Sequence, residues 1–296
     1  MRVTQRRLIE EASQSIAGYF ERLQKIQSII ASGKKLQKPE DDPLGAERAL
    51  SIRSHLQALE ATRRNLSLTD DWLSATEVAL KGLQQVAERA RVIALHAANE
   101  AAQSQEGFQV WAVEVGKLIE QAVQIGNSDH RGLYLFAGRK VTTQPFELTW
   151  TPAPQVSYRG DSGPMEHQLE GTVRIQVNVP GDHQLFQKMF ATLGDLYGRL
   201  RAGDTAGLRV SIGELEEAMN TTLETLAVIG SRARQVDETI SRLDALDVNL
   251  RGLLGQIEDA DMAKASLDLH LEERMYRAIL AASARLLGPS LFDYLG

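Results

Sequence analysis

Apolar residues recur at heptad spacing along the first thirty residues of the chain. The a and d positions of this repeat are filled by Ile9, Ile16, Leu23 and Ile30, with Ala12, Tyr19 and Ile26 between them. Such a stripe predicts a long amphipathic helix that packs against another helix. Ser32-Gly33 predicts the end of this helix, because glycine tolerates the left-handed conformation that closes a helix.

A second long helix is expected to start at a motif that we call the helix-restart motif, Asp41, Asp42 and Pro43. An aspartate at the cap accepts free backbone N–H groups, and proline at the first helical position has no N–H to leave unsatisfied. The heptads then continue through Ile52, Leu59, Leu66, Leu73, Leu80, Ala87, Ala94 and Ala101, and the pattern resumes from Phe108 to Ile125. We therefore expect an N-terminal assembly helix over residues 1–42 and the N-terminal half of a helical rod over residues 43–132.

Between residues 133 and 181 the apolar period changes from helical spacing to two. Alternation is seen in Phe146, Leu148 and Trp150, in Val156 and Tyr158, and in Val173, Ile175, Val177 and Val179. Most prolines of the chain fall in this stretch, and residues 160–163 form a Gly/Asp/Ser turn cluster. This pattern predicts a small antiparallel β module inserted between the helices.

Helical spacing returns after the β module and extends to the end of the chain. The expected seam of the long helix is Leu208, Ile212, Leu215, Met219, Thr222, Leu226, Ile229, Ala233, Val236, Ile240 and Leu243. Residues 182–260 should form the C-terminal half of the rod, and residues 261–296 a C-terminal assembly helix. The predicted fold is mainly α: a long antiparallel coiled-coil rod built from the N- and C-terminal segments, with a small antiparallel β module inserted.

The two terminal helices extend beyond the partners that the bundle offers them. Apolar stripes without such cover indicate packing between subunits. The residues predicted to form this assembly interface are Ile9, Ile16, Leu23, Ile30, Leu267, Leu271, Ile279, Leu286, Leu291, Phe292 and Leu295.

Composition excludes several classes of function. The net charge of −6 argues against a general nucleic-acid binder, and the absence of cysteine excludes thiolate metal sites and thiol nucleophiles. The six histidines are scattered, so no metal or other cofactor is expected. No apolar run is long enough to insert into a membrane, and the N-terminus has no cleaved secretory signal.

One turn permits an alternative interpretation. Residues 160–164, Gly-Asp-Ser-Gly-Pro, resemble the serine segment of trypsin-like proteases, and Arg159-Gly160-Asp161 is a tripeptide that some cell-surface receptors bind. An extracellular protease or adhesin that uses the turn from Arg159 to Ser162 is therefore an alternative of a different class. A plain hairpin turn is favoured, because the β structure is too small for the two barrels of such a protease.

Several motifs, taken together, resemble the flagellin superfamily, and most closely its proteins of the hook–filament junction. They occur in the family's order: Pro39 to Pro43, Ala97-Ala98-Asn99, Asn127-Ser128 with Gly132 to Gly138, Tyr158 to Asp161, Ile229 to Ala233, Glu258 to Ala263, and Ser290 to Leu295. They cover both ends and the middle of the chain. True flagellins usually lack the Asp-Asp-Pro of the restart motif, so a short flagellin that forms the filament itself is the second alternative.

The resemblance implies a structural protein rather than an enzyme. Such a protein would leave the cell by flagellar type III export, without a cleaved signal, and would be extracellular at the hook–filament junction. Its implied partners are further copies of itself in a ring, the adjacent hook-associated junction protein, flagellin, and an export chaperone that binds the C-terminal helix. The function expected is to join hook and filament by coiled-coil self-assembly.

Overall fold

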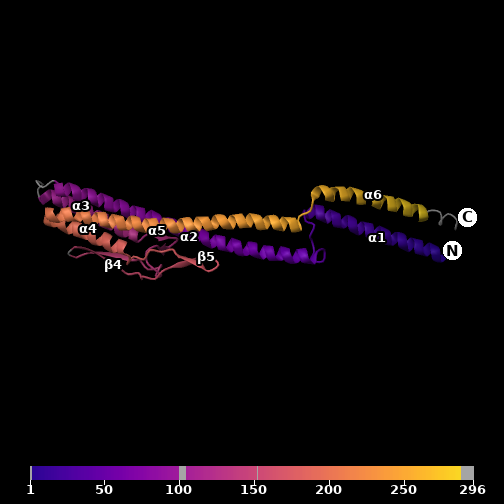
Figure 1. Ribbon diagram of the computed structural model, residues 1–296, viewed down its shortest axis with the longest axis horizontal. Helices are drawn as coiled ribbons and strands as arrows, with labels where there is room; N and C mark the ends of the chain where they lie inside the picture. The colour runs from indigo at the N-terminus through magenta and orange to yellow at the C-terminus, as the bar shows by residue number, and fades with distance from the viewer. Residues whose placement is uncertain (1, 100–104, 152, 288–296) are drawn as a thin grey trace. The chain divides into compact units, whose positions relative to one another are not determined.

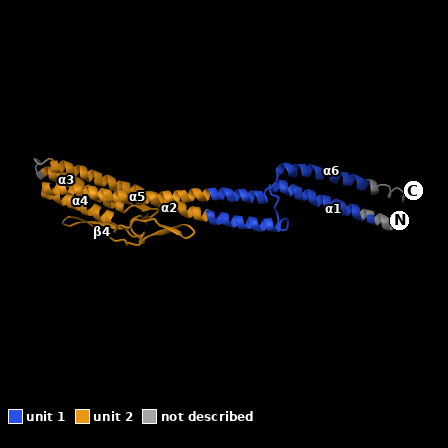
Figure 2. Cartoon of the chain, viewed as in Figure 1, with its two compact units in different colours: residues 1–59, 245–296 blue, residues 60–244 orange. Residues whose placement is uncertain are grey.

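The computed structural model describes residues 2–99, 105–151 and 153–287 (Figure 1). These residues form two compact units (Figure 2). One unit comprises residues 1–59 and 245–296, and the other comprises residues 60–244. Two long helices, α2 (Pro43–Asn99) and α5 (Thr205–Glu258), contribute residues to both units. Long helices dominate the described chain and the strands are short, so the expectation of a mainly α fold is confirmed.

The first unit contains the two terminal helices, α1 (Arg2–Ser32) and α6 (Met262–Leu287), which lie side by side (Figure 1). Their contacts run antiparallel: Phe20 meets Tyr276, and Arg22 pairs with Glu272. Gly33 ends α1 in the left-handed conformation, with φ of 70°. The N- and C-terminal segments of the chain thus pack together, as the heptad stripes indicated.

The second unit is a bundle of α2, α3 (Gln105–Gly126), α4 (Gln184–Ala202) and α5. Arg91 on α2 pairs with Glu216 on α5 at 2.8 Å, and Arg63 pairs with Asp244 at 3.0 Å. Between these two ion pairs the residue number on α2 decreases by as much as the residue number on α5 increases, so the two helices run antiparallel. The buried core on α2 includes the expected heptad residues Leu66, Leu73, Leu80, Ala87 and Ala94, and the neighbouring Trp72, Val86 and Ile93 are buried as well.

The buried face of α5 differs from the expected seam at every second layer. The residues spaced by seven from Leu208 to Leu243 are buried, as expected. At the intervening layers the buried residues are Ser211, Ala218, Thr225 and Thr239, whereas Ile212, Met219, Leu226 and Ile240 are half-buried beside them. Small side chains at these layers allow closer helix packing. The buried threonine hydroxyls donate to carbonyls one turn earlier in the same helix, which satisfies them.

The described part of the chain contains three antiparallel two-stranded ribbons. The first pairs β1 (Asp129–His130) with β2 (Leu133–Tyr134), and the second pairs β3 (Phe146–Trp150) with β4 (Pro154–Tyr158). The third pairs β5 (Glu166–Glu170) with β6 (Val173–Gln176). The alternating apolar residues of β3 and β4 are those that predicted strands, whereas β5 is mostly polar and gave no such signal.

Candidate assembly interface

The contact between α1 and α6 places part of the predicted interface inside one chain. Phe20 and Tyr276 have ring centroids 6.2 Å apart, and Arg22 Nε lies 3.4 Å from Glu272 Oε1. The inward side of α6 also carries Ala265 and Ser283, which are both buried. None of the described side chains of α1 is fully buried, so this pair of helices covers its apolar stripe only in part.

The predicted interface residues divide between two faces. Four of them are half-buried on the stripes where α1 and α6 meet: Ile16, Leu23, Ile30 and Ile279. Leu267 and Leu271 instead face away and are 70% and 61% exposed. Ile9 lies in α1 and Leu286 in α6, but their side chains are outside the described part of the structure, as are Leu291, Phe292 and Leu295 altogether.

The outward face of α6 carries an apolar row that we call the outer stripe: Leu267, Leu271 and Met275. These residues are spaced by four, so they stand above one another on one side of the helix. Met275 is 46% exposed, and Phe20 on the neighbouring helix is exposed to the same extent. Exposed large apolar side chains in a row are typical of a surface that another protein covers.

The helix-restart motif fixes the start of α2. Asp42 caps the helix, because its Oδ1 accepts the Gly45 backbone N–H at 3.0 Å, and Pro43 is the first helical residue. Asp41 accepts a hydrogen bond from Lys25 Nζ at 2.7 Å and further ones from the backbone N–H groups of Gln37 and Lys38. These interactions, the Lys25 hydrogen bond first, lower the pKa of Asp41. The motif therefore ties the end of α1 to the beginning of α2.

A buried carboxylate at the end of α5 connects the same region to the C-terminal segment. Glu258 is only 3% exposed, and it pairs with Lys34 and Arg53, each at 2.7 Å. Its backbone carbonyl accepts the Lys35 N–H, and the Ala260 N–H donates to the Gly33 carbonyl. This cluster could not be predicted from the sequence, because Lys34 and Glu258 are 224 residues apart.

The turn from Arg159 to Ser162 is held by contacts within the chain. Arg159 pairs with Glu147 on the adjacent strand. Asp161 Oδ1 accepts the backbone N–H groups of Arg139 and Gly163, and the Arg139 hydrogen bond is the main reason that the pKa of Asp161 is lowered. The Tyr158 hydroxyl lies 2.7 Å from the Asp161 carbonyl and 3.0 Å from that of Phe136. The charged groups of the tripeptide are thus used to build the loop.

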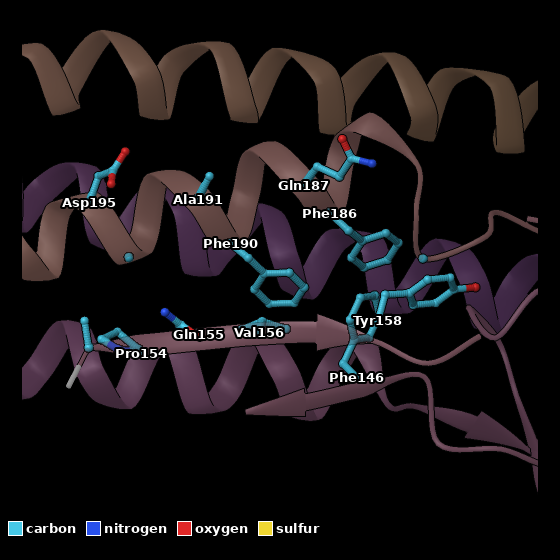
Figure 3. Close-up of a pocket in the computed structure, with 13 residues that line it drawn as sticks. Phe146, Pro154, Gln155, Val156, Tyr158, Phe186, Gln187, Phe190, Ala191 and Asp195 are labelled. Carbon is cyan, nitrogen blue, oxygen red and sulfur yellow. The ribbon is translucent and has the colours of Figure 1, made fainter. Parts of the chain in front are cut away.

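An aromatic cluster joins this β structure to α4. Phe146 lies 5.0 Å from Phe186, 5.1 Å from Phe190 and 5.4 Å from Tyr158, measured between ring centroids. The four rings lie close together (Figure 3), and they line a groove of about 540 Å³ between α4 and β4. A Cβ on Gly181 would lie 2.6 Å from the Phe146 ring, so the close approach requires glycine there.

No group of three or more histidine or acidic side chains among the described residues is placed to hold a metal ion. None of the described helices is long and apolar enough to cross a lipid bilayer.

Two family models match the chain. Residues 8–141 match the bacterial flagellin N-terminal helical region, and residues 212–294 match the bacterial flagellin C-terminal helical region. Together these matches cover well over half of the sequence.

Individual proteins are similar at low identity. The flagellin of Bacillus subtilis (strain 168) is 24% identical over 257 residues, which are 81% of each chain. Flagellar hook-associated protein 3 of Escherichia coli (strain K12) is 23% identical over 253 residues, or 82% of this chain and 72% of that protein.

Solved structures share the fold. The crystal structure of Bacillus cereus FlgL has a TM-score of 0.61 at 21% identity, and the match covers 69% of this chain and 99% of that one. The flagellar junction protein FlgL from Legionella pneumophila has a TM-score of 0.55 at 16% identity, with 70% and 98% covered.

Proposed function

The chain belongs to the flagellin superfamily, and from that premise we propose that it is the subunit that joins the flagellar hook to the filament. It is a structural component of the flagellum and not an enzyme. The proteins of matching fold include one described as a flagellar junction protein, and a hook-associated protein is among the relatives in sequence.

The observation that carries the proposal is the pair of terminal helices with an uncovered outer stripe. In the described part of the chain Leu267, Leu271 and Met275 stay 70%, 61% and 46% exposed, although burial of one such side chain stabilises a contact by roughly 1.5–3 kcal/mol. Neighbouring copies that cover this stripe would pack α1 and α6 into a continuous layer of helices. Closed assemblies of identical subunits, such as a ring, follow from one repeated contact of this kind.

The further partners belong to the same proposal. The hook side would contact the adjacent hook-associated junction protein, and the distal side would contact flagellin. An export chaperone that covers the apolar face of α6 before assembly would keep that face from premature contacts. The subunit would reach the outside of the cell by flagellar type III export.

A short flagellin is the competing function, because flagellins are among the relatives at comparable identity. The helix-restart motif and the Tyr158 to Asp161 turn favour the junction protein. Immunogold electron microscopy with an antibody against this chain distinguishes the two. Label confined to the boundary between hook and filament supports the junction, whereas label along the whole filament would establish a flagellin.

The assembly role is tested with the double variant Leu267→Asp and Leu271→Asp in a strain that lacks the native copy. Both positions are exposed, so the isolated variant should melt like the wild type. We expect motility to be lost and flagellin to be shed into the medium. The control is His270→Asp, which adds one negative charge at an exposed polar position of α6. Normal motility with the double variant would contradict the proposed role of the stripe.

A further inference from the structure

Arg232 on α5 is a half-buried cation that has no carboxylate partner among the described residues. Three arginines of the described chain are half-buried: Arg91, Arg199 and Arg232. Arg91 pairs with Glu216 at 2.8 Å, and Arg199 pairs with Glu214 at 2.6 Å. Arg232 makes no ion pair or side-chain hydrogen bond with any residue that the structure describes, and burial lowers its pKa.

The other arginines of the second unit that have no acidic partner are different in kind. Arg139, Arg201, Arg209 and Arg234 are exposed, so water solvates their guanidinium groups. A guanidinium that has lost part of its water and gained no carboxylate costs free energy in the folded chain. Such a group is expected where a ligand supplies the missing charge.

Arg232 lines a cleft of about 340 Å³ between α5 and the segment that leads from β6 into α4. Its polar lining includes Gln176, His183, Gln184 and Thr221. The His183 Nδ1 accepts the Leu185 backbone N–H at 3.3 Å, so in the neutral ring the proton is on Nε2, which can donate. Burial lowers the pKa of His183, which favours that neutral ring.

One acidic residue, Glu224, lines the same cleft. It is exposed, and it precedes Arg232 by eight residues of one helix, a rise of about 12 Å. Its carboxylate therefore does not neutralise the guanidinium. The cleft is at the lower end of the size range of small-molecule pockets, roughly 300–1,000 Å³, and it suits a short side chain.

We propose that this cleft binds a carboxylate, and that the carboxylate belongs to an acidic side chain of a second copy of this chain. The inference rests on the proposed function, because an assembled structural protein meets its own copies at high density. Charge complementarity supports this occupant, since acidic residues outnumber basic ones by 39 to 33 over the sequence. The unpaired cation in the isolated chain thus becomes a paired one in the assembly.

The test uses the variant Arg232→Lys in flagella isolated from cells that carry it as their sole copy. A carbodiimide joins an amine to a carboxylate only when the two are in contact, and peptide mass spectrometry of the covalent dimer identifies both residues. We expect position 232 of one copy to be linked to an aspartate or glutamate of another. The control is Arg234→Lys, which adds an amine on an exposed side of the same helix.

Further variants test how much the charge of Arg232 contributes to assembly. Arg232→Glu should reduce the number of attached filaments by about tenfold or more through like-charge repulsion, whereas Arg232→Gln should have a smaller effect and Arg234→Glu almost none. Equal melting temperatures of the purified variants would confirm that folding is intact.

Three results would overturn the inference. One is a link from position 232 to Glu224 of its own chain alone. Another is the absence of a cross-link at position 232 in flagella in which native lysines of this protein do form covalent dimers. The third is full filament attachment in Arg232→Glu, as expected if only a free small carboxylate enters the cleft. If isolated flagella lacked this protein altogether, the proposed function would fail first, and this inference with it.

Discussion

Lys34 Nζ lies 2.7 Å from Glu258 Oε2, although the two residues are 224 positions apart. Arg53 contacts the other oxygen of the same carboxylate at 2.7 Å. The three residues connect the end of α1, the beginning of α2 and the end of α5. Glu258 thus holds together the region where α1 ends and α6 begins.

Replacement of Glu258 by Gln should loosen this region. The change keeps the shape of the side chain but removes two charge-assisted hydrogen bonds, which contribute roughly 1.5–3 kcal/mol each before the cations regain water. The side chains of Lys34 and Arg53 are about half exposed, so in the variant water solvates much of their charge. We therefore expect a net loss of about 2 kcal/mol in stability. Amide hydrogen exchange in α1 should then accelerate about 30-fold. Glu60→Gln, which breaks an exposed pair with Arg64, is the matched control and should change little.

The contribution of Glu258 should also depend on pH. Burial alone would raise the pKa of this carboxyl, but the hydrogen bonds from Lys34 and Arg53 outweigh burial and lower it from its ordinary value of 4.5. A lowered pKa means stabilisation that is complete above the unfolded value and is lost as the pH falls through the folded value. The difference in stability between the wild type and Glu258→Gln should therefore be constant near neutral pH and shrink below about pH 4.5. A difference that grew on acidification would contradict this assignment.

Tyr158 should be the last tyrosine to ionise in the described part of the chain. Burial raises the pKa of its hydroxyl to about 12. A spectrophotometric titration of the folded protein should show one phenol that ionises about two pH units after an unperturbed one, and Tyr158→Phe should lack it. Since a raised pKa favours the neutral form, the stabilisation by this hydroxyl is present below pH 10 and lost as the pH rises towards 12. Titration of every phenol near pH 10 in the folded wild type would contradict the hydrogen-bonded turn.

Two substitutions on α5 test which face of this helix is buried. Ile229 is fully buried, and its neighbour Val228 is 48% exposed. Ile229→Ala should cost about 2–5 kcal/mol of unfolding free energy through lost contacts and a cavity. Val228→Ala, the adjacent control, should cost less than about 0.5 kcal/mol. Chemical denaturation of the two variants measures both values, and equal losses would show that the face is assigned wrongly.

The sequence predicted the elements of this protein better than the details of their packing. Heptads of Leu and Ala identified α2 and part of its core, because the apolar residues at the heptad positions from Leu59 to Ala94 are buried. On α5 the hydrophobic pattern selected Leu226, whereas the buried residue of that layer is Thr225. Hydropathy ranks leucine above threonine, but a close helix contact favours the smaller side chain whose hydroxyl is satisfied by its own helix.

The ion-pair cluster and β5 could not be predicted for other reasons. Glu258 resembles any surface glutamate until the fold brings Lys34 and Arg53 to it. In β5 only Leu169 is buried, so no alternation of apolar residues marks the strand. Its position depends instead on pairing with β6 and on single contacts with helices, such as that of His167 with Thr69.

The terminal helices should be the least protected part of the isolated protein. No described side chain of α1 is fully buried, whereas Leu66, Leu73 and Leu80 on α2 are entirely inaccessible. Local opening free energies follow buried apolar contact, so α1 and α6 should open far more often than the bundle of the second unit. Hydrogen exchange on dilute monomer should show fast exchange in residues 10–32 and 262–284 and strong protection in residues 66–98 and 208–243.

Assembly into flagella should then protect the terminal helices, because neighbouring copies cover the outer stripe and ordering is coupled to binding. Equal protection of both regions in a proven monomer would mean that the α1–α6 pair is stable by itself, and the outer stripe would then not be needed to order it.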